Sequence, residues 1–202
     1  MIGAGQGPFG RRRVVGREVR TQRASPPRVG YRRAHADSRT GDVLHFRGHG
    51  LVSRTIRLLT QGPYSRVGLA FLDQRRGHSL AAVGSSVRLV PMSQEMPRYH
   101  GGIESFEVTD TTAEQREDAI AFGLQQLGNL YDRPDILRFL VAIVLNHRPA
   151  VRRDQASFCS ELIAVACRAG GLPLAPVSVS YTSPADLALS PRLKRRYVLK
   201  GG

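Results

Sequence analysis

Strand-like segments occupy the first half of the folded part of this chain, and helix-like segments occupy most of the second half. Short apolar stretches bounded by turn residues predict strands at 42–46, 66–72, 79–83, 87–91, 103–108 and 195–199. No strand–helix alternation recurs along the chain, and no internal repeat is present. This order predicts an α+β fold and excludes a doubly wound parallel sheet.

Helices are predicted from apolar periodicity and from end signals at 50–60, 111–128, 134–147 and 157–173. The 111–128 helix opens with a capping box, Thr111 followed three residues later by Glu114. The 134–147 helix starts at Pro134 and is nearly all apolar, which indicates that it is buried. These segments contain enough apolar surface for one domain, expected at 39–202.

Arginine is concentrated at the N-terminus, where residues 1–38 show no apolar periodicity and are predicted to form a basic, extended arm. Residues 1–36 hold nine arginines and one acid, Glu18, a net charge of +8 out of +14 for the chain. Such an arm is either a solvated tail or a binding segment. As a binding segment it would engage a polyanion or other subunits of an assembly.

Apolar runs are too short for membrane spans. The longest, 139–145, falls far short of the ~20 residues that a spanning helix needs. The N-terminus lacks the apolar segment of a Sec signal peptide. No transmembrane segment and no Sec export are therefore expected.

Cys159 lies at the start of the 157–173 helix, two residues after Ser157, which could cap it. Free N–H groups and the helix dipole favour a thiolate there, so Cys159 is either a nucleophile or a small apolar filler. Cys167 lies eight residues further along the helix, roughly 12 Å away, which excludes a disulfide between the two. Cys167 is interpreted as filler.

A thiolate nucleophile usually needs a histidine base, and six histidines occur in the chain, at 35, 45, 49, 78, 100 and 147. Their spacing does not select one of them. His45, on the first predicted strand, is interpreted mainly as a half-buried sheet residue. No metal-ligand spacing is present, and no metal or cofactor is expected.

Three blocks of the sequence resemble a known family. "GDVLHFRGHGLVSRTIRLLTQGPYSRVGLAF", "GNLYD" and "SFCSELIAVACRAGGLPL", spread over about residues 40–190, are similar to the circularly permuted NlpC/P60 hydrolases, which are papain-like. The resemblance implies a small antiparallel sheet packed against helices. It also implies Cys159 as the nucleophile of acyl transfer on amides or esters.

Arg66 stands where this resemblance expects the catalytic histidine. Arginine stays protonated, so it cannot accept the proton of a thiol. Some members of the family place a second histidine about twelve residues later, which here is His78, so His78 is the candidate base. By the same resemblance, Tyr64 and Tyr131 are candidate pocket-lining residues.

Two functions follow from this resemblance. The first is a cysteine hydrolase that acts on amide bonds, with a peptide or peptidoglycan-like substrate, impaired by the loss of its histidine. The alternative is a catalytically inactive structural or binding component of a larger assembly, such as a phage or phage-like particle, anchored by the arm. The corresponding locations are the bacterial cytoplasm or a phage-like virion.

Overall fold

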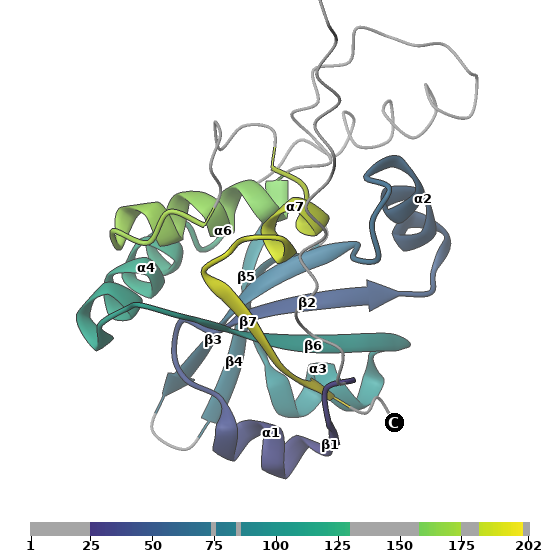
Figure 1. Ribbon diagram of the computed structural model, residues 1–202, viewed down its shortest axis with the longest axis horizontal. Helices are drawn as coiled ribbons and strands as arrows, with labels where there is room; N and C mark the ends of the chain where they lie inside the picture. Colours follow the sequence, from purple (N-terminus) through teal and green to yellow (C-terminus); the bar gives the residue numbers. More distant parts are fainter. Residues whose placement is uncertain (1–24, 74–75, 84–85, 130–157, 175–181, 200–202) are drawn as a thin grey trace, which may run out of the picture.

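The computed structural model describes residues 25–73, 76–83, 86–129, 158–174 and 182–199. These residues form an α+β fold in which one sheet carries helices on both of its faces (Figure 1). The strands are β1 (Arg28–Val29), β2 (Val43–Gly48), β3 (Arg66–Asp73), β4 (Arg76–Val83), β5 (Ser86–Pro91), β6 (Gly101–Val108) and β7 (Leu193–Leu199). The helices are α1 (Tyr31–Asp37), α2 (Leu51–Leu59), α3 (Met92–Arg98), α4 (Ala113–Gln125), α6 (Phe158–Ala169) and α7 (Pro184–Ala188).

The sheet has seven strands in the order β1-β7-β6-β2-β3-β4-β5. Neighbouring strands from β7 to β5 are antiparallel, and β1 adds a short parallel pairing with β7 at the edge. The sheet is therefore mixed, whereas the sequence led us to expect an antiparallel one. The α+β class itself is confirmed.

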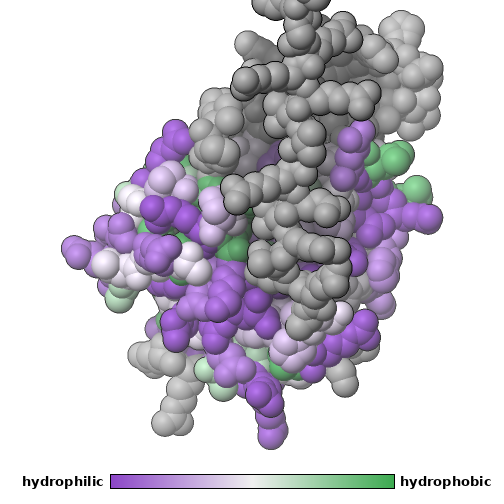
Figure 2. Space-filling view, viewed as in Figure 1, coloured by the Kyte–Doolittle hydropathy of each residue, from purple (hydrophilic) through white to green (hydrophobic). Residues whose placement is uncertain are grey.

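The two faces of the sheet bury two separate apolar clusters. The first lies under α4, α6 and α7 and includes Val67, Leu69, Leu80 and Ile163. The second lies on the side of α1 and α3 and contains Phe46, Met92 and Met96 among others. Because side chains alternate along a strand, adjacent residues of β2 and β3 contribute to different clusters. The described residues at the surface in this view are mainly hydrophilic (Figure 2).

Helix ends follow local signals in the sequence. The capping box of α4 is made by Thr112 and Gln115, one residue later than the pair expected from the sequence. After α6 the chain turns at Gly171, whose φ of 72° lies in the left-handed region that glycine adopts freely. Helices α4 and α6 meet at Gly170, where a β-carbon would overlap the carbonyl of Gln115.

The folded part begins earlier than the expected boundary at residue 39. Residues 28–37, assigned to the extended arm from their composition, form β1 and α1. Val29 and Ala34 are buried in the second cluster, and the Ser38 hydroxyl lies 2.6 Å from the Tyr197 hydroxyl on β7. Residues 1–24 and the predicted helix at 134–147 lie outside the described residues.

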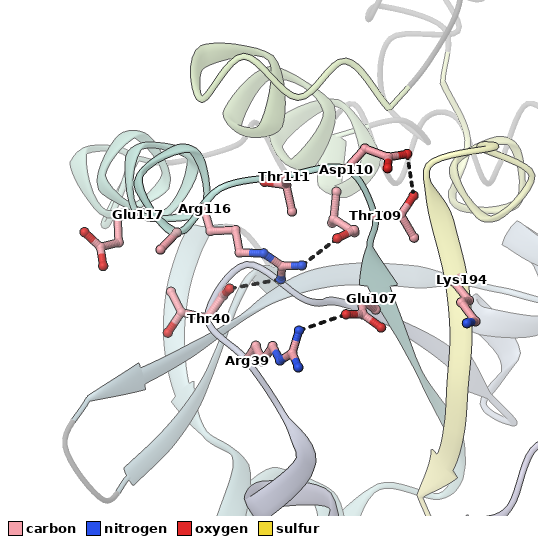
Figure 3. Close-up of a pocket in the computed structure, with 11 residues that line it drawn as sticks. Arg39, Thr40, Glu107, Thr109, Asp110, Thr111, Arg116, Glu117 and Lys194 are labelled. Atoms are coloured by element: carbon pink, nitrogen blue, oxygen red, sulfur yellow. Dashed lines mark hydrogen bonds and ion pairs between the residues drawn. The ribbon is translucent and has the colours of Figure 1, made fainter.

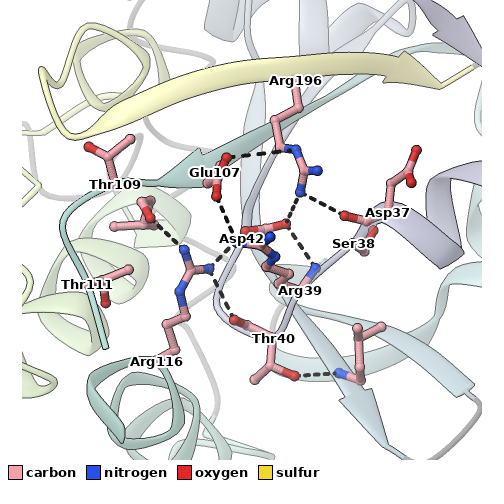
Figure 4. Close-up of polar contacts among 12 residues, drawn as sticks. Asp37, Ser38, Arg39, Thr40, Asp42, Glu107, Thr109, Thr111, Arg116 and Arg196 are labelled. Carbon is pink, nitrogen blue, oxygen red and sulfur yellow. Dashed lines mark hydrogen bonds and ion pairs between the residues drawn. The ribbon is translucent and has the colours of Figure 1, made fainter. Parts of the chain in front are cut away.

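The start of β2 is joined to α4 by a buried ion pair (Figure 4). Asp42 is fully buried, and its Oδ1 accepts a hydrogen bond from Nη1 of Arg116 at 2.9 Å. The other carboxylate oxygen accepts the backbone N–H of Arg39 at 2.9 Å and lies 3.8 Å from the Arg196 guanidinium. Arg116 also donates hydrogen bonds to the carbonyls of Thr40 and Val108. Its guanidinium group is therefore fixed by three different residues.

We expect Asp42→Asn to lower the free energy of unfolding by about 3–5 kcal/mol, because it leaves the Arg116 charge buried without a counter-charge. Denaturant unfolding followed by circular dichroism measures this change. The double variant Asp42→Asn/Arg116→Met should cost clearly less than the sum of the two single variants. As a control, Arg39→Met, which removes the exposed pair with Glu107, should cost about 1 kcal/mol or less. Additive single costs would contradict the role given to this pair.

Candidate functional site

Cys159 is the second residue of α6 and packs on the first apolar cluster, beside β3. Ser160, the next residue, donates its hydroxyl to the carbonyl of Thr182 and so fixes the start of the helix. Cys167 is buried further along the same helix. The structure thus places Cys159 at a helix N-terminus over the sheet, and its catalytic role remains a prediction.

The pKa of the Cys159 thiol is raised, and burial is the main cause. The backbone N–H of Val67, the charge of Arg66 and the amides at the start of α6 act in the opposite direction. Burial outweighs them, so the thiol form is favoured at neutral pH. In Cys167, burial raises the thiol pKa to about 12.

Arg66 is directed away from α6. Its Nη2 donates to Oε1 of Glu95 on α3 at 2.5 Å, and its guanidinium lies 3.8 Å from the centre of the Phe46 ring. Phe46 belongs to the second apolar cluster, while Cys159 contacts the first. Arg66 therefore acts on the thiol only through its charge, from the opposite face of the sheet.

His78 lies on β4, the strand next to β3, where the candidate base was expected. Its position along β4 is far from Cys159. Its partner on β3 is Phe71. Phe71 is four residues beyond Val67, which corresponds to roughly 13 Å along a strand. The structure does not bring His78 and Cys159 together, and His78 instead lines a pocket with Tyr31, Pro91 and Gln94.

His45 lies closer in the sheet to the thiol than His78 does, although its place on the first predicted strand led us to interpret it mainly as a half-buried sheet residue. It is fully buried, not half-buried, and pairs with Val67 on β3 and with Glu104 on β6. Its ring centre lies 4.8 Å from that of Tyr64 and 4.7 Å from that of Phe106. Burial lowers the pKa of His45 to about 3, so the ring is neutral at physiological pH.

Tyr64 is a core residue whose hydroxyl group forms a hydrogen bond. It is buried in the first cluster, and its hydroxyl donates to Oε2 of Glu104 at 2.6 Å. Glu104 also pairs with Arg47 at 3.0 Å and with Arg195 at 2.8 Å. Burial, reinforced by Glu104, raises the pKa of Tyr64, which therefore stays protonated. Tyr131, the other candidate pocket residue, lies outside the described residues.

A separate pocket lies between the end of β6 and the start of α4 (Figure 3). Its polar lining includes three cationic and three acidic side chains: Arg39, Arg116, Lys194, Glu107, Asp110 and Glu117. Arg116 is engaged by Asp42, and Arg39 donates to Glu107 at 3.0 Å. Lys194, Asp110 and Glu117 are the charged lining side chains outside these pairs, and they carry both signs, so the pocket does not present a site of one charge.

A metal centre is not found in the part of the chain that the structure describes. There, no group of three or more His, Cys, Asp or Glu side chains could hold a metal ion. The described part also contains no helix long and apolar enough to cross a membrane.

Comparison with known proteins finds a likeness among solved structures but not among sequences. No protein-family model matches the chain, and no curated protein matches its sequence. The fold is similar to the crystal structure of metalloprotein yiiX from Escherichia coli O157:H7, a DUF1105 protein, with a TM-score of 0.50 and 19% identity. The match covers 78% of this chain and 95% of that chain. At this identity the likeness shows the fold alone.

The resemblance to the circularly permuted NlpC/P60 hydrolases is therefore a wrong assignment. The similar solved structure carries a different family description, DUF1105, and no family model supports the papain-like one. The first of the blocks that suggested it covers β2, α2 and most of β3, and the third covers α6. Such blocks describe local elements, which many folds share, and do not fix how those elements are arranged.

We expect the buried neutral His45 to make stability depend on pH. Its pKa is about 3 in the folded protein against 6.5 ordinarily, so only the unfolded chain takes up this proton between those values. The free energy of unfolding should therefore fall as the pH is lowered through this window, by up to about 1.4 kcal/mol per pH unit.

His45→Phe, which keeps the ring contacts, should flatten the dependence, as measured by urea unfolding at several pH values. The exposed His100 provides the control, because His100→Gln should leave the slope unchanged. An equal slope in the parent chain and in His45→Phe would show that His45 is not the group responsible.

Proposed function

We propose that this protein is a non-hydrolytic binding component of a larger assembly, which engages a polyanionic partner through its arginine-rich arm. The observation that carries the proposal is the engagement of Arg66. Its guanidinium is committed to Glu95 and Phe46, on the face of the sheet away from Cys159. The Arg66 charge thus serves packing on α3 and is not placed to exchange a proton with the thiol.

Hydrolysis of an amide by a thiol needs a thiolate and a base that can return its proton to the leaving amine. The raised pKa of Cys159 opposes the first requirement. The second requirement is not met by His78, because its partner Phe71 lies about 13 Å along β3 from Val67, the residue beside the thiol. His45, with a pKa of about 3, is too weak a base to take a proton from a thiol.

The charge distribution supports a polyanionic partner. In the folded part, ion pairs engage the guanidinium groups of Arg47, Arg66, Arg116, Arg195 and Arg196. Residues 1–24, by contrast, contain six arginines and a single acid. We propose that these arginines meet phosphates or carboxylates of a partner, so association should depend steeply on salt.

The hydrolase alternative is tested by turnover of a peptidoglycan peptide and of an activated ester. We expect the parent chain and Cys159→Ala to give the same background rate, since the thiol is protonated and neither His45 nor His78 is a suitable base for it. Alkylation with iodoacetamide should be slow at neutral pH and should still accelerate above pH 9, in line with the raised thiol pKa. Turnover that Cys159→Ala or alkylation abolishes would refute the non-hydrolytic proposal.

Polyanion binding is tested with a short random-sequence DNA duplex over a series from about 50 to 200 mM salt. Replacing Arg11, Arg12 and Arg13 with Gln should reduce the slope of log affinity against log salt by up to about 2.7, at ~0.9 per phosphate contact. The control carries the same charge change on the exposed residues Arg76, Arg98 and Arg168 of the folded part. Equal effects of the two triple variants would rule out the arm as the binding segment.

A further inference from the structure

Helix α2 exposes large apolar side chains on a folded surface. Leu51, Val52 and Leu58 are 84%, 53% and 77% exposed. Leu51 and Leu58 are seven residues apart and so lie on the same face of the helix. Figure 2 shows hydrophobic surface, coloured green, projecting at the side of the molecule where Figure 1 places α2.

The helix stands at the end of the sheet. It follows β2 directly, and among the described elements its main packing partner is β2. At its other end the chain contacts α7, where a β-carbon on Gly62 would overlap that of Ala185. Its outward side therefore forms a convex ridge whose leucines have no partner in the described fold.

This ridge is also basic. Arg54 is exposed and lies on the same face as Leu51 and Leu58, and the sequence contains no Asp or Glu from 43 to 72. The exposed His49 follows β2, and its backbone N–H donates to the carbonyl of His100, an exposed residue that precedes β6. Apolar and cationic groups thus share one end of the molecule.

We propose that the α2 ridge, residues 49–58, docks on the surface of a bilayer that contains anionic phospholipid. A convex ridge with a few large apolar side chains is covered only by a partner that adapts to its shape. Lipid molecules can pack around such side chains, so no preformed groove is needed. Leu51, Val52 and Leu58 enter the interface while Arg54 extends its guanidinium to the phosphates. With only two turns of helix, binding is reversible and depends on anionic lipid.

The proposal goes beyond the assembly function above, because it concerns a different surface and holds whether or not the arm binds a polyanion. A direct test uses the absence of tryptophan from the chain. In Leu58→Trp, the indole should shift its emission to the blue and be quenched by brominated acyl chains. This should occur with phosphatidylcholine vesicles that contain phosphatidylserine and not with phosphatidylcholine alone.

Leu189→Trp is the matched control, because Leu189 is 82% exposed at the end of α7 and is not part of the ridge. Its emission should not change, even when the arm holds the protein on the vesicles. Unchanged emission of Leu58→Trp on vesicle-bound protein would overturn the proposal, since the arm alone would then account for binding. A shift that needs no lipid and grows with protein concentration would also overturn it, in favour of a second copy of the chain.

A second measurement keeps the native surface and removes the apolar contacts. In co-sedimentation of chains in which Arg11, Arg12 and Arg13 are replaced with Gln, which weakens binding by the arm, Leu51→Ser/Leu58→Ser should partition onto anionic vesicles about tenfold or more weakly than the same chain with both leucines. Leu189→Ser in that chain should leave its partitioning unchanged. Both substitutions change exposed side chains, so circular dichroism should show the same fold. Equal partitioning of the two variants would contradict insertion of the ridge.

Discussion

The ion pair between Asp42 and Arg116 ties together the parts of the fold that come from distant stretches of sequence. Burial raises the pKa of Asp42, while the Arg39 amide and the Arg116 guanidinium act to lower it. A buried carboxylate of this kind fixes position more than it adds stability, since any displacement would leave one charge unpaired. It sets α4 against the start of β2, and α4 in turn supports α6 at Gly170. The place of Cys159 over the sheet therefore depends on a charge pair remote from the thiol.

The alternation of side chains along β3 then decides what chemistry the thiol can have. Arg66 and Val67 are neighbours in sequence, but one faces α3 and the other faces α6. A cation placed on the far side of a strand can lower the pKa of a thiol a little, yet it cannot exchange a proton with it. Around Cys159 the described residues supply burial, backbone amides and the charge of Arg66, and burial has the largest effect on the thiol pKa. The thiol form is therefore favoured, although Cys159 is only partly buried.

Local patterns allowed the α+β class and the starts and ends of several elements to be predicted. The 157–173 segment, closed by glycines, became α6, and the cap of α4 was misplaced by a single residue. Contacts between distant residues were not predictable. The sequence around Asp42 does not indicate that its partner is Arg116. The burial of Val29 and Ala34 depends on the second cluster, which forms only when the strands of the sheet come together. The same limit explains why His78 was a reasonable candidate base by its spacing of twelve residues. The β3–β4 register pairs it with Phe71 and thereby separates it from the thiol.

The excess of arginine has different consequences in different parts of the chain. Where an arginine reaches a buried or half-buried acid, as Arg116 and Arg66 do, the fold uses the charge and none remains for a partner. Around α2 the sequence contains no acid from 43 to 72, so Arg54 has no counter-charge nearby in sequence, and it lies beside leucines that the fold leaves uncovered. The net charge of +14 is thus a poor guide to where the protein binds. The distribution of acids along the chain is a better guide, because it singles out residues 1–24, with one acid, and 43–72, with none, as the segments that we propose meet an anionic partner.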